Sequence, residues 1–193
     1  MNNLSFKNNK PKQINSFNEM ANNYCFWEYS ADALLKSASI LRREREREIQ
    51  AHKGLSGSYR CPPEYFTEEV EWMLKAFALE CLLKGLLVKS GHKIAENGKL
   101  KVNRNHALKN LAINVMGENN IQSNLQEALR KLSAVAILGR YPTAVNNNDL
   151  LKFCDEENTL GYVDSSVSIT ADEKSLIDTF ISELLRKLKE EIG

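Results

Sequence analysis

Apolar residues recur three or four positions apart over several long segments of this sequence, and this spacing constrains the fold more than any other feature. The spacing places apolar side chains on one face of an α-helix, whereas a half-buried strand alternates apolar and polar residues. Residues 170–192 carry the cleanest stripe, and no segment shows a convincing strand alternation. The sequence therefore predicts an all-α fold.

We expect an up-and-down bundle of about five helices, with the most hydrophobic segment as its central helix. A chain of 193 residues can bury one such core without metal or disulfide support. Residues 1–17, rich in Asn, Lys and Gln, predict a flexible tail before a single domain over residues 18–193. The expected helices cover about 18–52, 67–89, 105–116, 123–138 and 170–192.

The ends of the predicted helices carry residues that are typical of helix termini. Glycine favours the left-handed conformation in which many helices end, so Gly91 and Gly117 are expected to end the second and third helices. Single N-cap residues and capping boxes mark the starts, because their side chains bond the free N–H groups of the first turn. The expected caps are Thr67, Asn105, Ser123 with Gln126, and Thr170 with Glu173.

Two polar segments interrupt the helical pattern. Residues 91–105 contain Asn97-Gly98, a dipeptide typical of tight hairpin turns, and predict a small ribbon. Residues 143–169 have little periodicity and predict a long polar loop before the last helix. A loop of this length is uncommon in a compact domain and is often functional.

The net charge and the scattered cysteines and histidines argue against several classes of protein. The 26 basic and 25 acidic residues nearly cancel, whereas a protein that wraps duplex nucleic acid is far more basic. The four cysteines and three histidines are scattered, so we expect no metal site and no cofactor. The polar N-terminus lacks a signal peptide and the longest apolar run is too short to cross a bilayer, which predicts a cytoplasmic protein without membrane contact.

Two charged residues stand inside the most hydrophobic segment. Glu80 precedes Lys84 by four positions, the favourable order for an ion pair on a helix. One interpretation is an ion pair at the edge of the core, with the lysine reaching toward solvent. The other places the Glu80 carboxylate beside the guanidinium of Arg140, which it would orient.

The fourth predicted helix runs into Gly139-Arg140-Tyr141-Pro142, where the proline prevents continuation. An Arg beside a Tyr at a helix end can contact the phosphate and the ring of a nucleotide or of single-stranded RNA. Packing of the Tyr141 ring over the open end of the bundle is the alternative, and the two interpretations are compatible.

Three stretches, in this order, resemble the HEPN superfamily of helical-bundle proteins. They are the long segment EYFTEEVEWMLKAFALECLLKGLLVKSG, the helix start HALKNL, and the leucine-rich helix that runs into GRYP. The resemblance covers about residues 24–145, and the last helix takes the place of the usual bundle closer. It implies a bundle that is often a homodimer, and surplus apolar residues on the first and last helices agree with this expectation.

Some HEPN proteins are metal-independent ribonucleases that use an Arg followed, after four to six residues, by a His. Arg140 takes the place of this arginine, but Val145, Asn146 and Asn147 occupy the positions of the histidine. RNA cleavage by 2′-hydroxyl attack needs a group that exchanges protons near neutral pH, which an imidazole does and an amide does not. The sequence therefore argues against nuclease activity.

Three hypotheses follow from the resemblance. The first is a non-catalytic binding module, a homodimer that binds a nucleotide, RNA or a partner protein in a dimer cleft around Arg140, Tyr141, Glu80 and Lys84. The second is a divergent endoribonuclease that uses Arg140 and His106, although a histidine at this place in the family commonly helps to start the helix. The third is a structural subunit whose long polar loop docks a nucleotidyltransferase partner.

Overall fold

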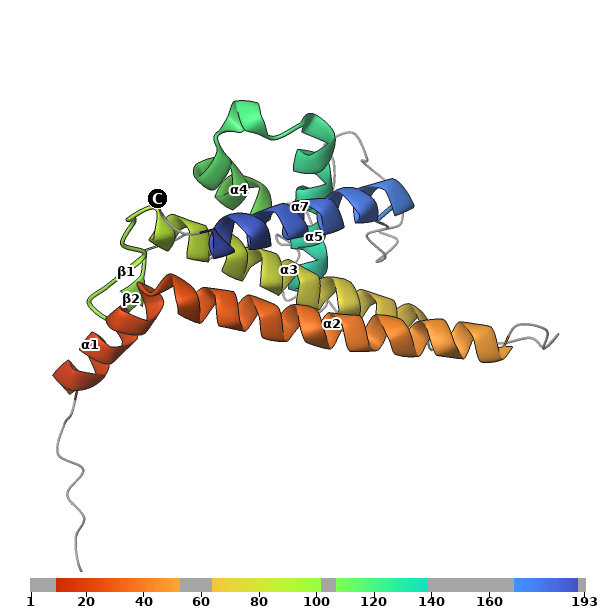
Figure 1. Ribbon diagram of the computed structural model, residues 1–193, viewed down its shortest axis with the longest axis horizontal. Helices are drawn as coiled ribbons and strands as arrows, with labels where there is room; N and C mark the ends of the chain where they lie inside the picture. Colours follow the sequence, from red (N-terminus) through yellow and green to blue (C-terminus); the bar gives the residue numbers. More distant parts are fainter. Residues whose placement is uncertain (1–9, 53–63, 102–106, 139–168, 191–193) are drawn as a thin grey trace, which may run out of the picture.

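The computed structural model describes residues 10–52, 64–101, 107–138 and 169–190, which form an all-α bundle with one small β-ribbon (Figure 1). The predicted fold class is confirmed. The elements are α1 (Lys10–Ala21), α2 (Tyr24–His52), α3 (Glu64–Lys89), β1 (Ala95–Glu96), β2 (Lys99–Leu100), α4 (Leu108–Met116), the short 3₁₀ helix η1 (Glu118–Asn120), α5 (Ser123–Leu138) and α7 (Ala171–Lys189).

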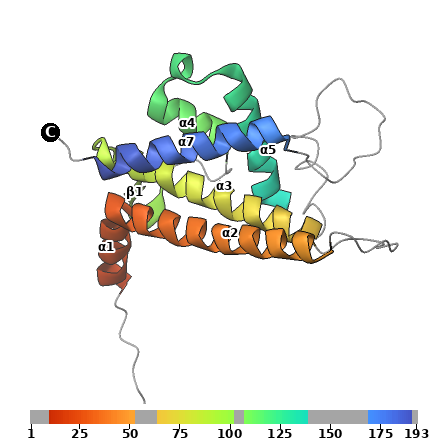
Figure 2. The same cartoon turned by 45° about the vertical axis from the view of Figure 1, so that its right-hand side comes forward.

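Helix α3 is the centre of the bundle and packs against α2, α4, α5 and α7. Helices α2 and α7 lie along α3, whereas α5 crosses it, as both views show (Figures 1 and 2). The core is mainly aliphatic, and its fully buried leucines are Leu79, Leu82, Leu83, Leu108, Leu129, Leu132, Leu184 and Leu188. In the part of the chain that the structure describes, no helix is both long and apolar enough to cross a bilayer.

Gly85 allows three helices to approach closely at one point. A Cβ atom at this position of α3 would lie 3.2 Å from Cβ of Trp27 on α2 and 3.2 Å from Cδ2 of Leu188 on α7. Glycine inside a helix costs about 1 kcal/mol relative to alanine. The close packing of α2 and α7 on α3 offsets this cost.

The N-terminal part differs from the prediction in two ways. The segment expected as one helix from about residue 18 is divided into α1 and α2 at Asn22 and Asn23, and α1 begins at Lys10, inside the segment expected as a tail. Helix α1 leaves the end of α2 on the side that faces away from α3 (Figures 1 and 2). The break therefore turns α1 out of the bundle.

The side chain of Asn22 holds the break against the β-ribbon. Its Oδ1 accepts hydrogen bonds from the N–H groups of Ile94 at 2.9 Å and Ala95 at 3.1 Å, and its Nδ2 donates to Ala95 O at 2.9 Å. Asn18 on α1 accepts a further bond from the Gly98 N–H, at 3.0 Å. The ribbon itself was predicted, since β1 and β2 pair antiparallel around Asn97 and Gly98, whose φ angles are 53° and 73°.

Several predicted helix ends are confirmed. Thr170 and Glu173 form the expected capping box at the start of α7. Gly91 has a φ of +88° and follows α3, where the His92 N–H bonds Leu87 O at 3.0 Å. Gly117, with a φ of +82°, ends α4.

Two predicted helix starts are wrong by a few residues, whereas α5 begins at Ser123 as predicted but without the expected capping box. Helix α3 begins at Glu64, so Thr67 lies within its first turn. The N-cap of α4 is Ala107, not Asn105, and a side chain of another helix takes one free N–H group, because Ser133 Oγ on α5 accepts from Leu108 N at 3.0 Å. In α5, Gln126 turns its amide to Ile121 O at 3.0 Å and forms no capping box with Ser123.

Lys89, the last residue of α3, secures the end of α7. Its ammonium group donates to the carbonyl oxygens of Leu188 at 2.7 Å and Lys187 at 3.0 Å, and also to that of Glu190. A cation suits this position because the free carbonyl groups at a helix C-terminus carry partial negative charge.

Candidate functional site

Glu80 and Lys84 form an ion pair within α3. The Lys84 ammonium lies 2.5 Å from Glu80 Oε1 and 5.2 Å from the centre of the Trp27 ring, and both residues are buried. This arrangement corresponds to the first interpretation of the sequence, an ion pair at the edge of the core. The position of Glu80 relative to Arg140 is not part of the described structure.

The other residues of the predicted cleft lie outside the described residues. Arg140 and Tyr141 follow the last described residue of α5, and His106 directly precedes the described residues of α4. The long polar loop also falls outside the described ranges, apart from its last residue. The ligand site and the ribonuclease pair therefore stay predictions.

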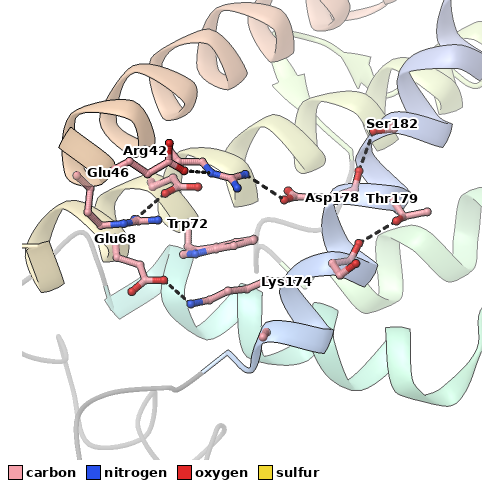
Figure 3. A pocket seen from close by; sticks show the side chains of 12 residues that line it. Arg42, Glu46, Glu68, Trp72, Lys174, Asp178, Thr179 and Ser182 are labelled. Atoms are coloured by element: carbon pink, nitrogen blue, oxygen red, sulfur yellow. Dashed lines mark hydrogen bonds and ion pairs between the residues drawn. The ribbon is translucent and has the colours of Figure 1, made fainter. Parts of the chain in front are cut away.

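A polar groove of about 530 Å³ lies where α2, α3 and α7 meet (Figure 3). Each of the three helices contributes charged side chains to it. The charged and aromatic residues of the groove are Arg42, Arg45 and Glu46 from α2, Glu68, Glu71 and Trp72 from α3, and Lys174 and Asp178 from α7.

The carboxylate of Glu71 is the buried centre of this groove. The whole residue is 0% exposed, and its Oε2 lies 2.7 Å from the Arg45 guanidinium. Its Oε1 lies 3.1 Å from the ammonium of Lys75, one helical turn further along α3. Lys75 also reaches Asp178 on α7, at 2.8 Å. These contacts form a charge network that joins all three helices.

Trp72 lies beside this network, with positive charge close to its ring. The Lys75 ammonium lies 3.9 Å from the ring centre, and that of Lys174 lies 5.8 Å from it. Both distances suit cation–π attraction. Lys174 also pairs with Glu68 (Figure 3). Burial opposes ionisation of Glu68, but the hydrogen bond with Lys174 and the positive charges of Lys174 and Arg45 together outweigh it and hold the pKa of Glu68 below its usual value.

The charges of the groove largely neutralise one another. Four carboxylates and three basic groups line it, and the basic groups all contact carboxylates: Arg42 with Glu46, Arg45 with Glu71, and Lys174 with Glu68. A phosphate would have to compete with these carboxylates for the same cations. The geometry therefore supports an electrostatic clamp between three helices in preference to an anion site.

This network was not predicted from the sequence. Arg45 stands among the many charged residues of the segment LRREREREIQ, and in the structure it turns inward to Glu71. The spacing of Glu71 and Lys75, four apart within a predicted core helix, is the signal that could have revealed it.

The opposite side of α2 carries an uncharged surface that no described element covers. Phe26, Tyr29 and Ile40 are 41%, 79% and 51% exposed. With the small, exposed residues Ala33 and Ser37 they recur at helical spacing on one side, which we call the outer face of α2. The views agree that this helix forms the edge of the bundle (Figures 1 and 2).

The described residues offer little for metal or thiol chemistry. Within the described ranges, no three His, Cys, Asp or Glu side chains gather so that they could hold a metal ion. Burial raises the pKa of Cys81 to about 11, so this thiol is protonated at neutral pH. Cys81 packs against the hydrophobic core.

No family model, curated protein or solved structure matches the chain.

Proposed function

We propose that this protein is a HEPN-like, non-catalytic binding module that acts as a homodimer. The outer face of α2 is the observation that carries the proposal. A tyrosine that is 79% exposed, together with two exposed large apolar side chains on the same helix face, marks an interaction surface more than isolated surface residues do. Aromatic side chains of this kind contribute much of the binding energy at protein interfaces.

The groove between α2, α3 and α7 also supports a binding surface on the outer face of α2. Its charges neutralise one another, so they stabilise the bundle and leave α2 fixed in place with its outer face toward solvent. A helix held rigidly on one side loses little conformational freedom when its other side binds.

Sedimentation of the purified chain over a range of concentrations tests the homodimer. We expect a dimer mass for the natural sequence and a monomer for Tyr29→Lys, because the charge would be buried unpaired in the interface. Val70→Lys is the matched control, since Val70 is 39% exposed but lies on α3. A monomer for the natural sequence at every concentration would contradict the proposal.

The ligand of the module is expected at Arg140 and Tyr141, where a guanidinium beside a ring suits a nucleotide or single-stranded RNA, whereas a nucleotidyltransferase partner would dock on the loop of residues 143–169. Binding of a labelled single-stranded RNA and of ATP, followed by fluorescence polarisation, tests the first two. We expect Arg140→Ala to weaken binding and Arg43→Ala, a loss of charge at an exposed position of α2, to leave it nearly unchanged. Equal binding by both variants would remove Arg140 from the site.

A further inference from the structure

We infer that the outer face of α2 binds the same face of a second copy, with the two helices antiparallel and a two-fold axis beside Ala33. This inference rests on the proposed homodimer and specifies its interface. A two-fold interface is self-complementary, and a residue on the axis meets its own copy. Ala33 is the central residue of the outer face and is small enough for two helices to approach closely.

The residues on either side of Ala33 fit this axis. At equal distances from it lie Tyr29 and Ser37, and further out Phe26 and Ile40. In an antiparallel pair, the bulky exposed Tyr29 of one copy is therefore level with the small Ser37 of the other. Phe26 is level with Ile40, so the two other large apolar side chains of the face also meet.

The polar groups of this face can be buried at little cost. The hydroxyl of Ser37 donates to Ala33 O at 3.0 Å, and that of Ser30 donates to Phe26 O at 2.8 Å. Each hydroxyl thus has a partner within its own helix, and contact with a second copy would leave neither donor unpaired. From Phe26 to Ile40 the centre of the face carries no charge.

Charges at the edge of the face favour the antiparallel direction. Asp32 and Lys36 lie one turn apart on the same edge of α2, and Asp32 also faces Lys189 of its own α7 at 3.7 Å. An antiparallel two-fold brings Asp32 of one copy next to Lys36 of the other. A parallel two-fold would place these edges of the two copies on opposite sides of the interface, so the attraction between Asp32 and Lys36 would be lost.

Helix α1 provides an independent argument for the same direction. It projects from the N-terminal end of α2 on the side of the outer face (Figures 1 and 2). In a parallel pair, both copies of α1 would project from the same end of the interface and compete for the same space. In an antiparallel pair they lie at opposite ends. If the two α2 helices cross at an angle at Ala33, the parts of each α2 beyond the crossing point also diverge from the partner's α1.

Cysteine cross-linking tests this arrangement in chains whose four natural cysteines are replaced. Ala33→Cys should form a disulfide-linked dimer on mild oxidation, whereas Ser39→Cys, exposed on another side of α2, should not. Circular dichroism of each variant confirms that the helices are intact.

Two further variants and a short bismaleimide cross-linker test whether the two α2 helices are antiparallel. An equal mixture of Phe26→Cys and Ile40→Cys should give a cross-linked heterodimer, while each variant alone gives much less. Efficient cross-linking of each variant with itself would indicate parallel helices and overturn the inference. Failure of Ala33→Cys to cross-link while sedimentation still shows a dimer would overturn the inference alone, and a monomer for the natural sequence would overturn the homodimer as well.

Discussion

Arg45 on α2 and Glu71 on α3 lie 2.7 Å apart in the interior of the bundle, although the sequence places Arg45 in a run of seven charged residues. Their contact is the point at which the long charged end of α2 is fixed to the central helix. It explains why a segment with few apolar residues stays packed.

Glu71→Gln should lower the free energy of unfolding by about 3–5 kcal/mol, because it leaves Arg45 and Lys75 without the buried carboxylate that neutralises them. Urea denaturation measures the change. Glu46→Gln is the control, since it breaks an exposed ion pair with Arg42 and should cost at most about 1 kcal/mol. Equal costs for the two variants would show that the buried pair has no special role.

Gly85→Ala should destabilise the protein by about 1–3 kcal/mol, although alanine is the better helix former. The added methyl group would lie 3.2 Å from Cβ of Trp27, an atom that cannot move without its helix. Thermal unfolding measures the effect, and Leu188→Val in the same chain should recover part of the loss by making room on the α7 side. An increase in stability for Gly85→Ala alone would contradict this account.

Acid should remove the contribution of Glu173 to stability. Burial raises the pKa of this carboxyl, but the hydrogen bond from Lys131 at 2.7 Å and the bonds at Thr170 outweigh burial, so the pKa lies below its usual value of 4.5. A lowered pKa in the folded state means stabilisation that is complete well above pH 4.5 and is lost as the pH falls through the folded pKa.

Glu173→Gln should therefore cost about 1 kcal/mol at neutral pH and progressively less below about pH 4.5, as unfolding curves at several pH values would reveal. Thr170→Ala is a second test. It removes the cap hydroxyl at a cost of about 1 kcal/mol, and with it one of the bonds that lower the pKa of Glu173, so it should reduce the pH dependence only in part. Parallel pH profiles for the natural chain and Glu173→Gln would be evidence against the ion pair.

Asn22→Ala should free the β-ribbon from the break between α1 and α2. The variant loses three hydrogen bonds and leaves the N–H groups of Ile94 and Ala95 without their acceptor. Hydrogen exchange should accelerate at these two amides with little change in the centre of α3. Asn18→Ala, which removes only the acceptor of the Gly98 N–H, should accelerate exchange at that amide alone.

The sequence could predict features that depend on neighbours along the chain. Apolar spacing is a local property, and so are the capping box at Thr170, the helix end at Gly91 and the hairpin turn at Asn97-Gly98. The fold class and these ends follow from such patterns because the responsible groups lie within one helical turn or one tight turn.

Features set by contacts between distant segments could not be predicted in this way. Nothing in the charged end of α2 distinguishes Arg45 from its neighbours until α3 approaches it. The acceptor for the first N–H of α4 is Ser133, 25 positions away in the sequence. Asn22 likewise reads as a polar residue in a helical pattern, and only the nearby ribbon makes the interruption at that point favourable.

The ammonium of Lys89 has a consequence for how the protein unfolds. The Lys89 side chain at the end of α3 donates hydrogen bonds to carbonyl groups at the end of α7. The final turn of either helix can therefore unfold only when these hydrogen bonds break. The two termini should then melt in a single cooperative step, and mechanical pulling on the C-terminal helix should transmit load directly to the core.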